Sequence, residues 1–498
     1  MELQFNKLVL PCLKTLIREV QTQEQTQEVR IPDGMPDIGT VIGSWGQVIV
    51  RGKEWHGGNM SVSGGVMTFV LFEPEDGSIP RCIEAWLPFQ LKWDFTGGER
   101  DGSILILPQL YSIDARVLSA RKIMIRASVG ALGEAMLPGE IDLYEPGDLP
   151  EDVCLQKIKY PVRLPREAGE KSFMLEETLS LPASAAKPDA IVCYNLRTEV
   201  TDRKIVSDKV VMRGVAVLHL LYTGEDGQLY TLDFDVPFSQ YAELDREYEP
   251  EDELKIDFIV TNLDVEKKDD GVILKAGLSG QYVVYDQSVV EIVSDAYSPH
   301  REISPEVIKL QLPTLLDYVE ETVAVQQNIE ADCVGLIDAV IYTEHPVVYQ
   351  EKDEITAELS GTFRVLYRDE NGEIQNQNVR WGSEWKIKAA EYVRMDIGVM
   401  PTGRVQAAAG SGSVTLKSDL HITALTMNSQ GMAMVTSLNL GETAEPNPGR
   451  PSLILCRAGE DSLWEIAKRS GSTVELIEKA NSLKQEPEES KMLIVPVL

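Results

Sequence analysis

The chain has 498 residues, of which 43% are hydrophobic, and its formal net charge at pH 7 is −32. A chain of this length is expected to form roughly three or four domains rather than one. The acidic balance argues against nucleic acid and anionic membranes as partners, because both bind clusters of Lys and Arg. Solubility and self-repulsion are the simplest interpretation of the charge.

The N-terminal residues lack the pattern of an export signal. Pro11 interrupts the short apolar stretch near the start and Glu2 precedes it, whereas a secretory signal has a basic start and a longer apolar core. No run of about 18 or more apolar residues occurs, so we expect neither a transmembrane helix nor membrane insertion. We therefore expect a cytoplasmic protein. The six cysteines form no Cys-x-x-Cys pair and predict reduced, mostly buried thiols: Cys12, Cys82, Cys154, Cys193, Cys333 and Cys456.

One sequence pattern occurs three times. An apolar strand ending in an aromatic residue is followed by an acidic turn and a glycine in "VLFEPEDG", "LLYTGEDG" and "VLYRDENG". The closing glycines are Gly77, Gly227 and Gly372, which lie 150 and 145 residues apart (227 − 77 and 372 − 227). Such a fixed period indicates three copies of a domain of about 150 residues, an ordinary domain size. Other positions keep nearly the same spacing, namely Pro11, Pro161 and Pro313, then Gly64, Gly214 and Gly361, then Arg126, Lys275 and Lys417.

Each copy has the pattern of β-structure. Segments such as "KVVMRGVAVLHLLY" are rich in Val, Leu and Tyr and alternate partly with a period of two. The Asp-Gly and Asn-Gly turns are typical of hairpins, because Gly accepts a positive φ. We predict a mainly β chain with three tandem antiparallel β-sandwich-like repeats, at residues 1–150, 151–303 and 304–443.

The pattern changes after the third copy. Residues 444–451 are rich in Pro and Gly and predict a linker, and residues 452–498 predict a small βααβ domain. Ser462 with Glu465 and Ser472 with Glu475 have capping-box spacing, and each pair is expected to open a helix. Gly471 is expected to end the first helix.

Residues 453–496 resemble the LysM domain. The family motif has Leu-Trp-x-Ile-Ala in the first helix and Ala-Asn at the end of the second, and this chain has "SLWEIAKR" and "EKANSL" at those places. The spacing of apolar residues in the first helix favours a packed core rather than a sugar platform for Trp464. The resemblance implies a core that contains Leu463, Trp464, Ile466 and Ala467.

Two departures from the LysM motif favour a protein ligand over a glycan. The first loop is one residue longer than the family's and acidic, and Glu489-Ser490 replaces a Pro-Gly pair in the second. In LysM domains that bind glycan, the sugar lies between these loops, where close approach to the backbone favours small residues. We expect the partner groove to be formed by Gly459, Glu460, Asp461, Ser462, Lys468, Arg469, Asn481 and Ser482.

The repeats resemble the SPOCS domain, through "ETLSLP", the Pro188-Asp189 pair and the "G…LLY" strand. SPOCS repeats followed by a LysM domain resemble SipL-type proteins, the spore-coat morphogenetic factors of anaerobic endospore formers. The resemblance implies a non-catalytic adaptor in the mother-cell cytoplasm. Its LysM domain would bind SpoIVA, the ATPase that polymerises into the basement layer of the coat, at the forespore surface.

The residues themselves give little sign of catalysis. No HExxH, GxSxG, Walker or GxGxxG motif occurs, and we expect no cofactor, metal or catalytic residue. Asp233 and Asp235 lie on one strand face and are interpreted as solvated charge rather than a metal clip, and His219 as a sheet-face residue. Trp381 and Trp385 share a strand face, where a place in the core is favoured over an exposed anchor.

Two alternatives to the adaptor stay open. The first is a protein that binds peptidoglycan or N-acetylglucosamine through the LysM domain, which retention on insoluble peptidoglycan would reveal. The second is a hydrolase without a recognisable motif, which a concave pocket with two or three convergent ionisable groups in one repeat would favour.

Overall fold

The computed structural model describes residues 1–97, 102–352, 354–388, 394–410, 412–443, 449, 451–457, 461–483 and 492–498. Strands hold 79% of the residues and helices 3%, and the described sheets are antiparallel. The prediction of a mainly β chain with antiparallel sheets is confirmed. No helix among the described residues has the length and apolar character needed to cross a bilayer.

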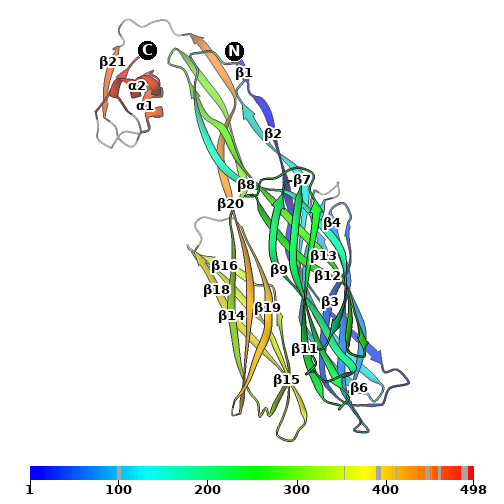
Figure 1. Cartoon of the computed structure of the whole chain (residues 1–498). Helices are drawn as coiled ribbons and strands as arrows, with labels where there is room; N and C mark the ends of the chain where they lie inside the picture. Colours follow the sequence, from blue (N-terminus) through cyan, green and yellow to red (C-terminus); the bar gives the residue numbers. More distant parts are fainter. Residues whose placement is uncertain are drawn as a thin grey trace.

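Three successive segments each form two packed sheets with the same strand order (Figure 1). We refer to strands β2–β7 as repeat 1, β8–β13 as repeat 2 and β14–β20 as repeat 3. Repeat 1 has the sheet orders β2-β7-β6 and β3-β4-β5, and repeat 2 has β8-β13-β12 and β9-β10-β11. The strands of these two repeats are β2 (Asn6–Arg30), β3 (Ile38–Trp55), β4 (Asn59–Pro74), β5 (Arg81–Asp94), β6 (Ser103–Ser119), β7 (Lys122–Glu145), β8 (Cys154–Ser180), β9 (Pro188–Val206), β10 (Lys209–Gly224), β11 (Leu229–Glu243), β12 (Glu253–Lys268) and β13 (Gly271–Tyr297).

Repeat 3 has the same order with one interruption. The strand equivalent to β3 and β9 is split into β15 and β16, which flank His345-Pro346, and proline has no backbone N–H for a ladder. The predicted boundary between residues 303 and 304 falls inside β14, near its start. The strands are β14 (Arg301–Glu330), β15 (Gly335–Thr343), β16 (Val347–Glu351), β17 (Glu354–Arg368), β18 (Ile374–Lys388), β19 (Arg394–Gly410) and β20 (Ser413–Thr443), and β1 (Glu2–Gln4) pairs with β20.

Period-two alternation places the apolar side chains of each repeat between its two sheets. In β10, Val210, Met212, Ala216, Leu218 and Leu220 are all buried. The cores are not separate, because Trp45 and Ile49 of repeat 1 pack into the core of repeat 2. Val340 and Leu366 of repeat 3 belong to the same core, so the three repeats are packed against one another rather than folded as separate domains.

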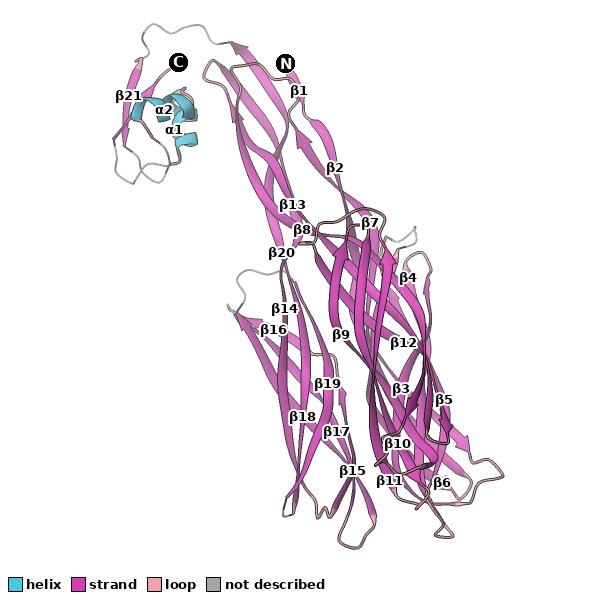
Figure 2. Ribbon diagram, viewed as in Figure 1, coloured by secondary structure: helices cyan, strands magenta, loops and turns pink. Residues whose placement is uncertain are grey.

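Six long strands extend beyond the sandwiches and form a narrow stalk (Figures 1 and 2). The stalk comprises residues 2–13, 138–145, 154–165, 286–297, 301–315 and 428–443, paired as β2 with β7, β8 with β13 and β14 with β20. A two-stranded ribbon alone is marginally stable in water, so three ribbons from the three repeats share one core. That core includes Cys12, Ile141, Val162, Ile292, Leu312 and Met434.

Residues 453–457, 461–483 and 492–496 form a small module beside the tip of the stalk (Figure 1). It consists of β21 (Leu453–Arg457), α1 (Leu463–Ser470), α2 (Val474–Asn481) and β22 (Met492–Pro496), with β21 and β22 paired. The predicted capping box of Ser462 and Glu465 is present, and Gly471 ends α1 with a left-handed φ of 64°. We call this unit the C-terminal module.

The second predicted capping box is wrong. Thr473, not Ser472, is the N-cap of α2, and its hydroxyl accepts a hydrogen bond from the backbone N–H of Leu476 at 3.3 Å. Ser472 instead closes α1, because its N–H donates to the carbonyl of Ala467 at 2.9 Å. The left-handed turn at Gly471 therefore shifts the start of α2 by one residue.

All six cysteines are free thiols, as predicted. Cys12 and Cys193 are buried, whereas Cys82, Cys154, Cys333 and Cys456 are half-buried. The expectation that most of them are buried is therefore wrong.

Candidate functional site

The predicted partner groove of the C-terminal module lies at the ends of its two helices. Gly459 and Glu460 fall outside the described residues. Asp461 precedes α1 and accepts a hydrogen bond from Arg469 Nη1 at 2.8 Å, an exposed pair. This pair lies on the open surface of the module and is available to a partner.

Three other groove residues have structural roles in the module. The hydroxyl of Ser462 caps α1. Asn481 joins α2 to β22, because its amide donates to the carbonyls of Ile477 at 2.8 Å and Ile494 at 2.7 Å and accepts from the N–H of Ile494 at 2.8 Å. Ser482 ends α2 in the left-handed region, with a φ of 53°. The predicted site is therefore built on well-anchored elements.

Lys468, the remaining groove residue, faces the stalk. Its Nζ lies 2.8 Å and 2.7 Å from the two carboxylate oxygens of Asp295 in β13. The indole N–H of Trp464 donates to the same carboxylate at 2.8 Å. The groove residues of α1 are thus divided between an open side at Arg469 and a side that contacts the stalk.

The core of the C-terminal module contains Leu463, Ile466 and Ala467, which are buried together with Ile477, Leu493 and Val495. Trp464 is only partly buried. Its ring meets Tyr297 of β13 edge to face, with 4.7 Å between centroids and 74° between planes. Trp464 therefore lies at the border between the module and the stalk rather than in the middle of the module.

We refer to the contact between the C-terminal module and the stalk as the module seam. Its stalk residues are Cys154, Asp295 and Tyr297, and its module residues are Trp464, Lys468 and Ser472. The hydroxyl of Tyr297, a residue 5% exposed, donates to the carbonyl of Ser472 at 3.0 Å. Burial alone would raise the pKa of Asp295, but the hydrogen bonds from Lys468 and Trp464 hold that pKa below its usual range.

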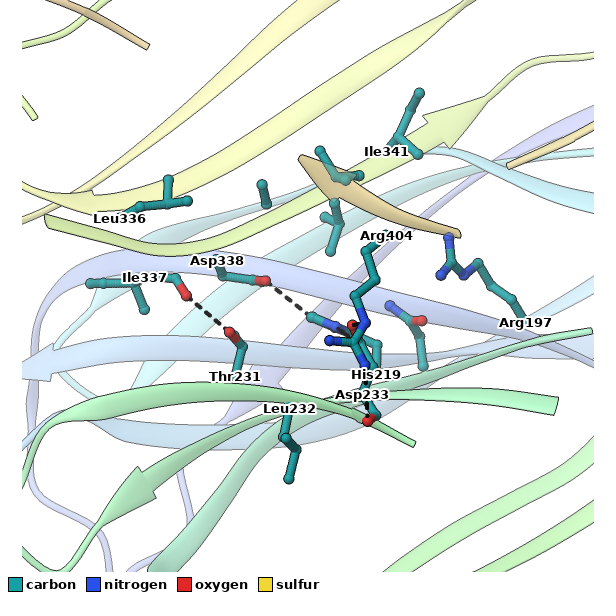
Figure 3. Close-up of a pocket in the computed structure, with 14 residues that line it drawn as sticks. Arg197, His219, Thr231, Leu232, Asp233, Leu336, Ile337, Asp338, Ile341 and Arg404 are labelled. Atoms are coloured by element: carbon teal, nitrogen blue, oxygen red, sulfur yellow. Dashed lines mark hydrogen bonds and ion pairs between the residues drawn. The ribbon is translucent and has the colours of Figure 1, made fainter. Parts of the chain in front are cut away.

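A second polar cluster lies between repeats 2 and 3, beside a cavity of about 220 Å³. Figure 3 shows the imidazole of His219 between Asp233 and Asp338. Nδ1 lies 2.6 Å from Asp233, its direct cross-strand neighbour, and Nε2 lies 3.0 Å from Asp338 of β15, outside good hydrogen-bond geometry. Burial favours the neutral ring, but Asp338 and Asp233 outweigh it and raise the pKa of His219 to about 10.

The solvated-charge interpretation is wrong for Asp233 and correct for Asp235. The side chain of Asp233 is 11% exposed and also binds Arg404 Nε at 2.7 Å, whereas Asp235 is exposed. Sequence reasoning missed this cluster, because Asp338 and Arg404 come from another repeat. The only signal in the sequence is the placement of a His and an Asp on facing strands of one hairpin.

The cluster does not have the arrangement of a catalytic site. Both nitrogens of His219 face carboxylates, so the charged ring has no free lone pair for a general base. The hydroxyl of Thr231, which also lines the cavity, donates to the carbonyl of Ile337 at 3.2 Å. No group of three or more His, Cys, Asp or Glu that could hold a metal occurs among the residues that the structure describes. The cluster is best explained as a joint between two repeats.

A third cluster joins repeats 1 and 3 below the stalk. Arg18 contacts Glu134 and lies 2.8 Å from Asp396, and Arg394 bonds both carboxylates, at 3.2 Å and 2.9 Å. Burial opposes ionisation of Glu134, but Arg18, Lys255 and Arg394 lower its pKa to about 2. These charges neutralise one another and hold the repeats together.

Trp381 and Trp385 lie in the core of repeat 3, at 4% and 5% exposure, so the interpretation as core residues is confirmed. The indole N–H of Trp385 donates to Glu321 at 2.8 Å. Neither ring provides an exposed binding surface.

A family model matches part of the chain. Residues 189–268, from β9 to the end of β12, match the family described as SipL, SPOCS domain. No curated protein and no solved structure matches the chain. Repeat 2 is therefore similar to the SPOCS domain of SipL, and this similarity supports a relationship to that family.

Proposed function

We propose that this chain is a non-catalytic adaptor in endospore coat assembly. The observation that carries the proposal is the match of residues 189–268 to the SPOCS domain of SipL. Repeats 1 and 3 have the same sheet order as repeat 2. We therefore propose that all three are SPOCS domains and that the chain works in the mother-cell cytoplasm at the forespore surface.

The arrangement of the chain supports a scaffold rather than an enzyme. The buried ionisable groups described above are paired with one another, and the pairs of Arg18 with Asp396 and of His219 with Asp338 cross the interfaces between repeats. Such pairing rigidifies a structure and leaves no acid or base free for chemistry. A rigid body with a stalk and a small module at its tip suits the presentation of a binding head.

The binding head in this proposal is the C-terminal module, acting as a LysM domain. Its partner is a coat morphogenetic ATPase of the SpoIVA type. The exposed Asp461 and Arg469 pair offers charges of both signs beside a fixed helix end, as the polar rim of a protein interface does. Rim charges set selectivity and association rate more than total affinity.

The proposal is tested with the purified full-length chain, the purified ATPase and insoluble peptidoglycan. We expect the chain to bind the ATPase and to stay in the supernatant when peptidoglycan is sedimented. The variant D461A/R469A should weaken ATPase binding, whereas K187A, in the exposed loop between β8 and β9 of repeat 2, should not. Sedimentation with peptidoglycan that D461A/R469A reduces and K187A does not would instead support the glycan-binding alternative.

A further inference from the structure

The C-terminal module and the stalk are two separately packed units in contact. Among the described residues, the module core is formed by side chains of the module together with only Tyr297 and Cys154 of the stalk, and the stalk tip has its own core, which includes Phe5, Val293, Ala296 and Leu438. Figure 1 shows α1 and α2 on the side of the module that faces the stalk and β21 on the far side. Separation of the units would therefore leave both cores nearly intact.

A β-bulge in β13 of the stalk forms part of the surface that contacts α1. The pairing of β13 with β8 is shifted between Val293 and Asp295, which marks a β-bulge directly before Asp295. Bulges re-aim side chains and are common next to functional sites. Here the bulge presents a carboxylate to Trp464 and Lys468, beside the ring of Tyr297. Asp295, which lies next to the ring of Tyr297, thus binds both the indole of Trp464 and the amine of Lys468.

The contacts across the module seam are few and partly open to water. The side chains of Lys468 and Asp295 are 44% and 25% exposed, and partly exposed ion pairs contribute little to stability. Among the described residues, the other contacts are the indole hydrogen bond, one edge-to-face ring pair, the hydrogen bond from Tyr297 to Ser472 and the packing of Cys154 against the module core. Covalent linkage through residues 444–452 raises the local concentration of the module, so a weak contact can still be occupied most of the time.

We infer that the module seam is a reversible latch, in which the stalk occupies the α1 surface that a protein partner would use. Trp464 combines a large apolar area with a polar N–H, and Trp is enriched among the residues that dominate binding energy at interfaces. When the latch is closed, Asp295 and Tyr297 contact Trp464, and Asp295 also pairs with Lys468. The partner that fits the freed surface presents a carboxylate beside an aromatic or apolar surface, as the stalk does.

The latch is inferred from the module seam alone. The further inference that the stalk and a protein partner compete for the α1 surface rests on the proposed function. If the latch is closed most of the time, the apparent affinity for the partner is reduced by the fraction of open molecules. A variant that increases the fraction of open molecules should therefore lower the apparent Kd by the same factor.

The latch is tested without any partner by the alkylation of Cys154 in the full-length chain. Cys154 is half-buried at the seam, and burial raises the pKa of its thiol, so opening should speed its reaction with N-ethylmaleimide. Peptide mass spectrometry follows each thiol separately, and Cys333 of repeat 3, also half-buried, is the internal standard. We expect D295A to raise the rate at Cys154 severalfold and to leave Cys333 unchanged.

A matched control comes from the same strand. Glu291 of β13 forms an exposed pair with Lys157 of β8 at 2.9 Å, away from the seam, so E291A should leave Cys154 protected. The swap D295K/K468D should restore part of the protection that D295K alone removes. Equal rates at Cys154 in the wild type and D295A, or a response to E291A of the same size as that to D295A, would overturn the latch.

The partner is then added to separate the two proposals. A lower apparent Kd of D295A for the SpoIVA-type ATPase, with E291A unchanged, supports competition. Faster alkylation with an equal or higher Kd would overturn competition while leaving the latch. Faster alkylation with no binding by any variant would overturn the proposed function and not the latch.

Discussion

His219 of repeat 2 and Asp338 of repeat 3 face each other across a buried interface, with 3.0 Å between the imidazole Nε2 and a carboxylate oxygen. Asp233 holds the other nitrogen at 2.6 Å, so the ring is charged on the inside of the molecule. The charge of one histidine thus links two consecutive repeats, through residues that are 119 positions apart in the sequence (338 − 219).

This pairing predicts a loss of stability at alkaline pH. The pKa of His219 is raised to about 10 in the folded chain, above its unfolded value near 6.5. Its contribution is fully present below pH 6.5 and is lost as the pH rises toward 10, with a slope of up to about 1.4 kcal/mol per pH unit. We expect urea unfolding between pH 6.5 and 10 to show this decline, and H219Q to flatten it. A decline of the same size in H219Q would show that His219 is not its source.

His345 predicts the opposite behaviour on the acid side. It is buried between repeats 1 and 3, with Nδ1 2.7 Å from the hydroxyl of Tyr111 and Nε2 3.0 Å from the carbonyl of Leu107. Burial lowers its pKa to about 4. Its contribution is therefore present above pH 6.5 and is lost as the pH falls toward 4. H345Q should reduce the loss of stability in that range, and H56Q, at an exposed histidine, should not; equal effects of the two variants would contradict the assignment.

The cluster of Glu134 predicts a large mutational effect. E134A leaves Arg18 and Arg394 facing a site with one carboxylate fewer, and breaking a buried ion pair in this way costs about 3–5 kcal/mol. We expect a lower urea midpoint at pH 7 with an unchanged slope. D142A removes the exposed pair with Lys7 and should change the midpoint little. A midpoint of E134A as high as that of D142A would mean that the buried cluster does not hold the repeats together.

Because Thr473 rather than Ser472 caps α2, alanine substitutions at these two residues should differ in their effect on the stability of the helix. T473A removes the acceptor for the N–H of Leu476 and should destabilise the helix by about 1 kcal/mol. The hydroxyl of Ser472 has no hydrogen-bond partner among the described residues, so S472A should be nearly neutral. Hydrogen exchange of the α2 amides in the full-length chain measures both effects. Faster exchange in S472A than in T473A would support the capping box expected from the sequence instead.

The sequence predicted what depends on local pattern. Alternation and Asp-Gly turns predicted antiparallel β-structure, and the Ser462 capping box with Gly471 predicted the extent of α1. The start of α2 was missed by one residue, because the choice between Ser472 and Thr473 depends on how the chain leaves Gly471.

Contacts between repeats were beyond the reach of local pattern. From local sequence, Asp233 is interpreted as a solvated charge. In the structure it lies in a polar cluster with Asp338 and Arg404, which belong to another repeat. Trp464 has helical core spacing, yet its ring packs on Tyr297 of a strand far away in the sequence. For the same reason, the candidate groove included Lys468 without its stalk partner Asp295.

The variant I466D is the sharpest test of whether the C-terminal module is the binding head of an adaptor. Ile466 is fully buried in the module core, so an aspartate there should unfold the module and leave the repeats intact. The affinity of the full-length chain for the SpoIVA-type ATPase is measured for the wild type, I466D and the exposed control V347D of repeat 3. We expect I466D to lose binding and V347D to keep it. Equal binding by I466D and the wild type, with the module shown to be unfolded by hydrogen exchange, would contradict this role of the module.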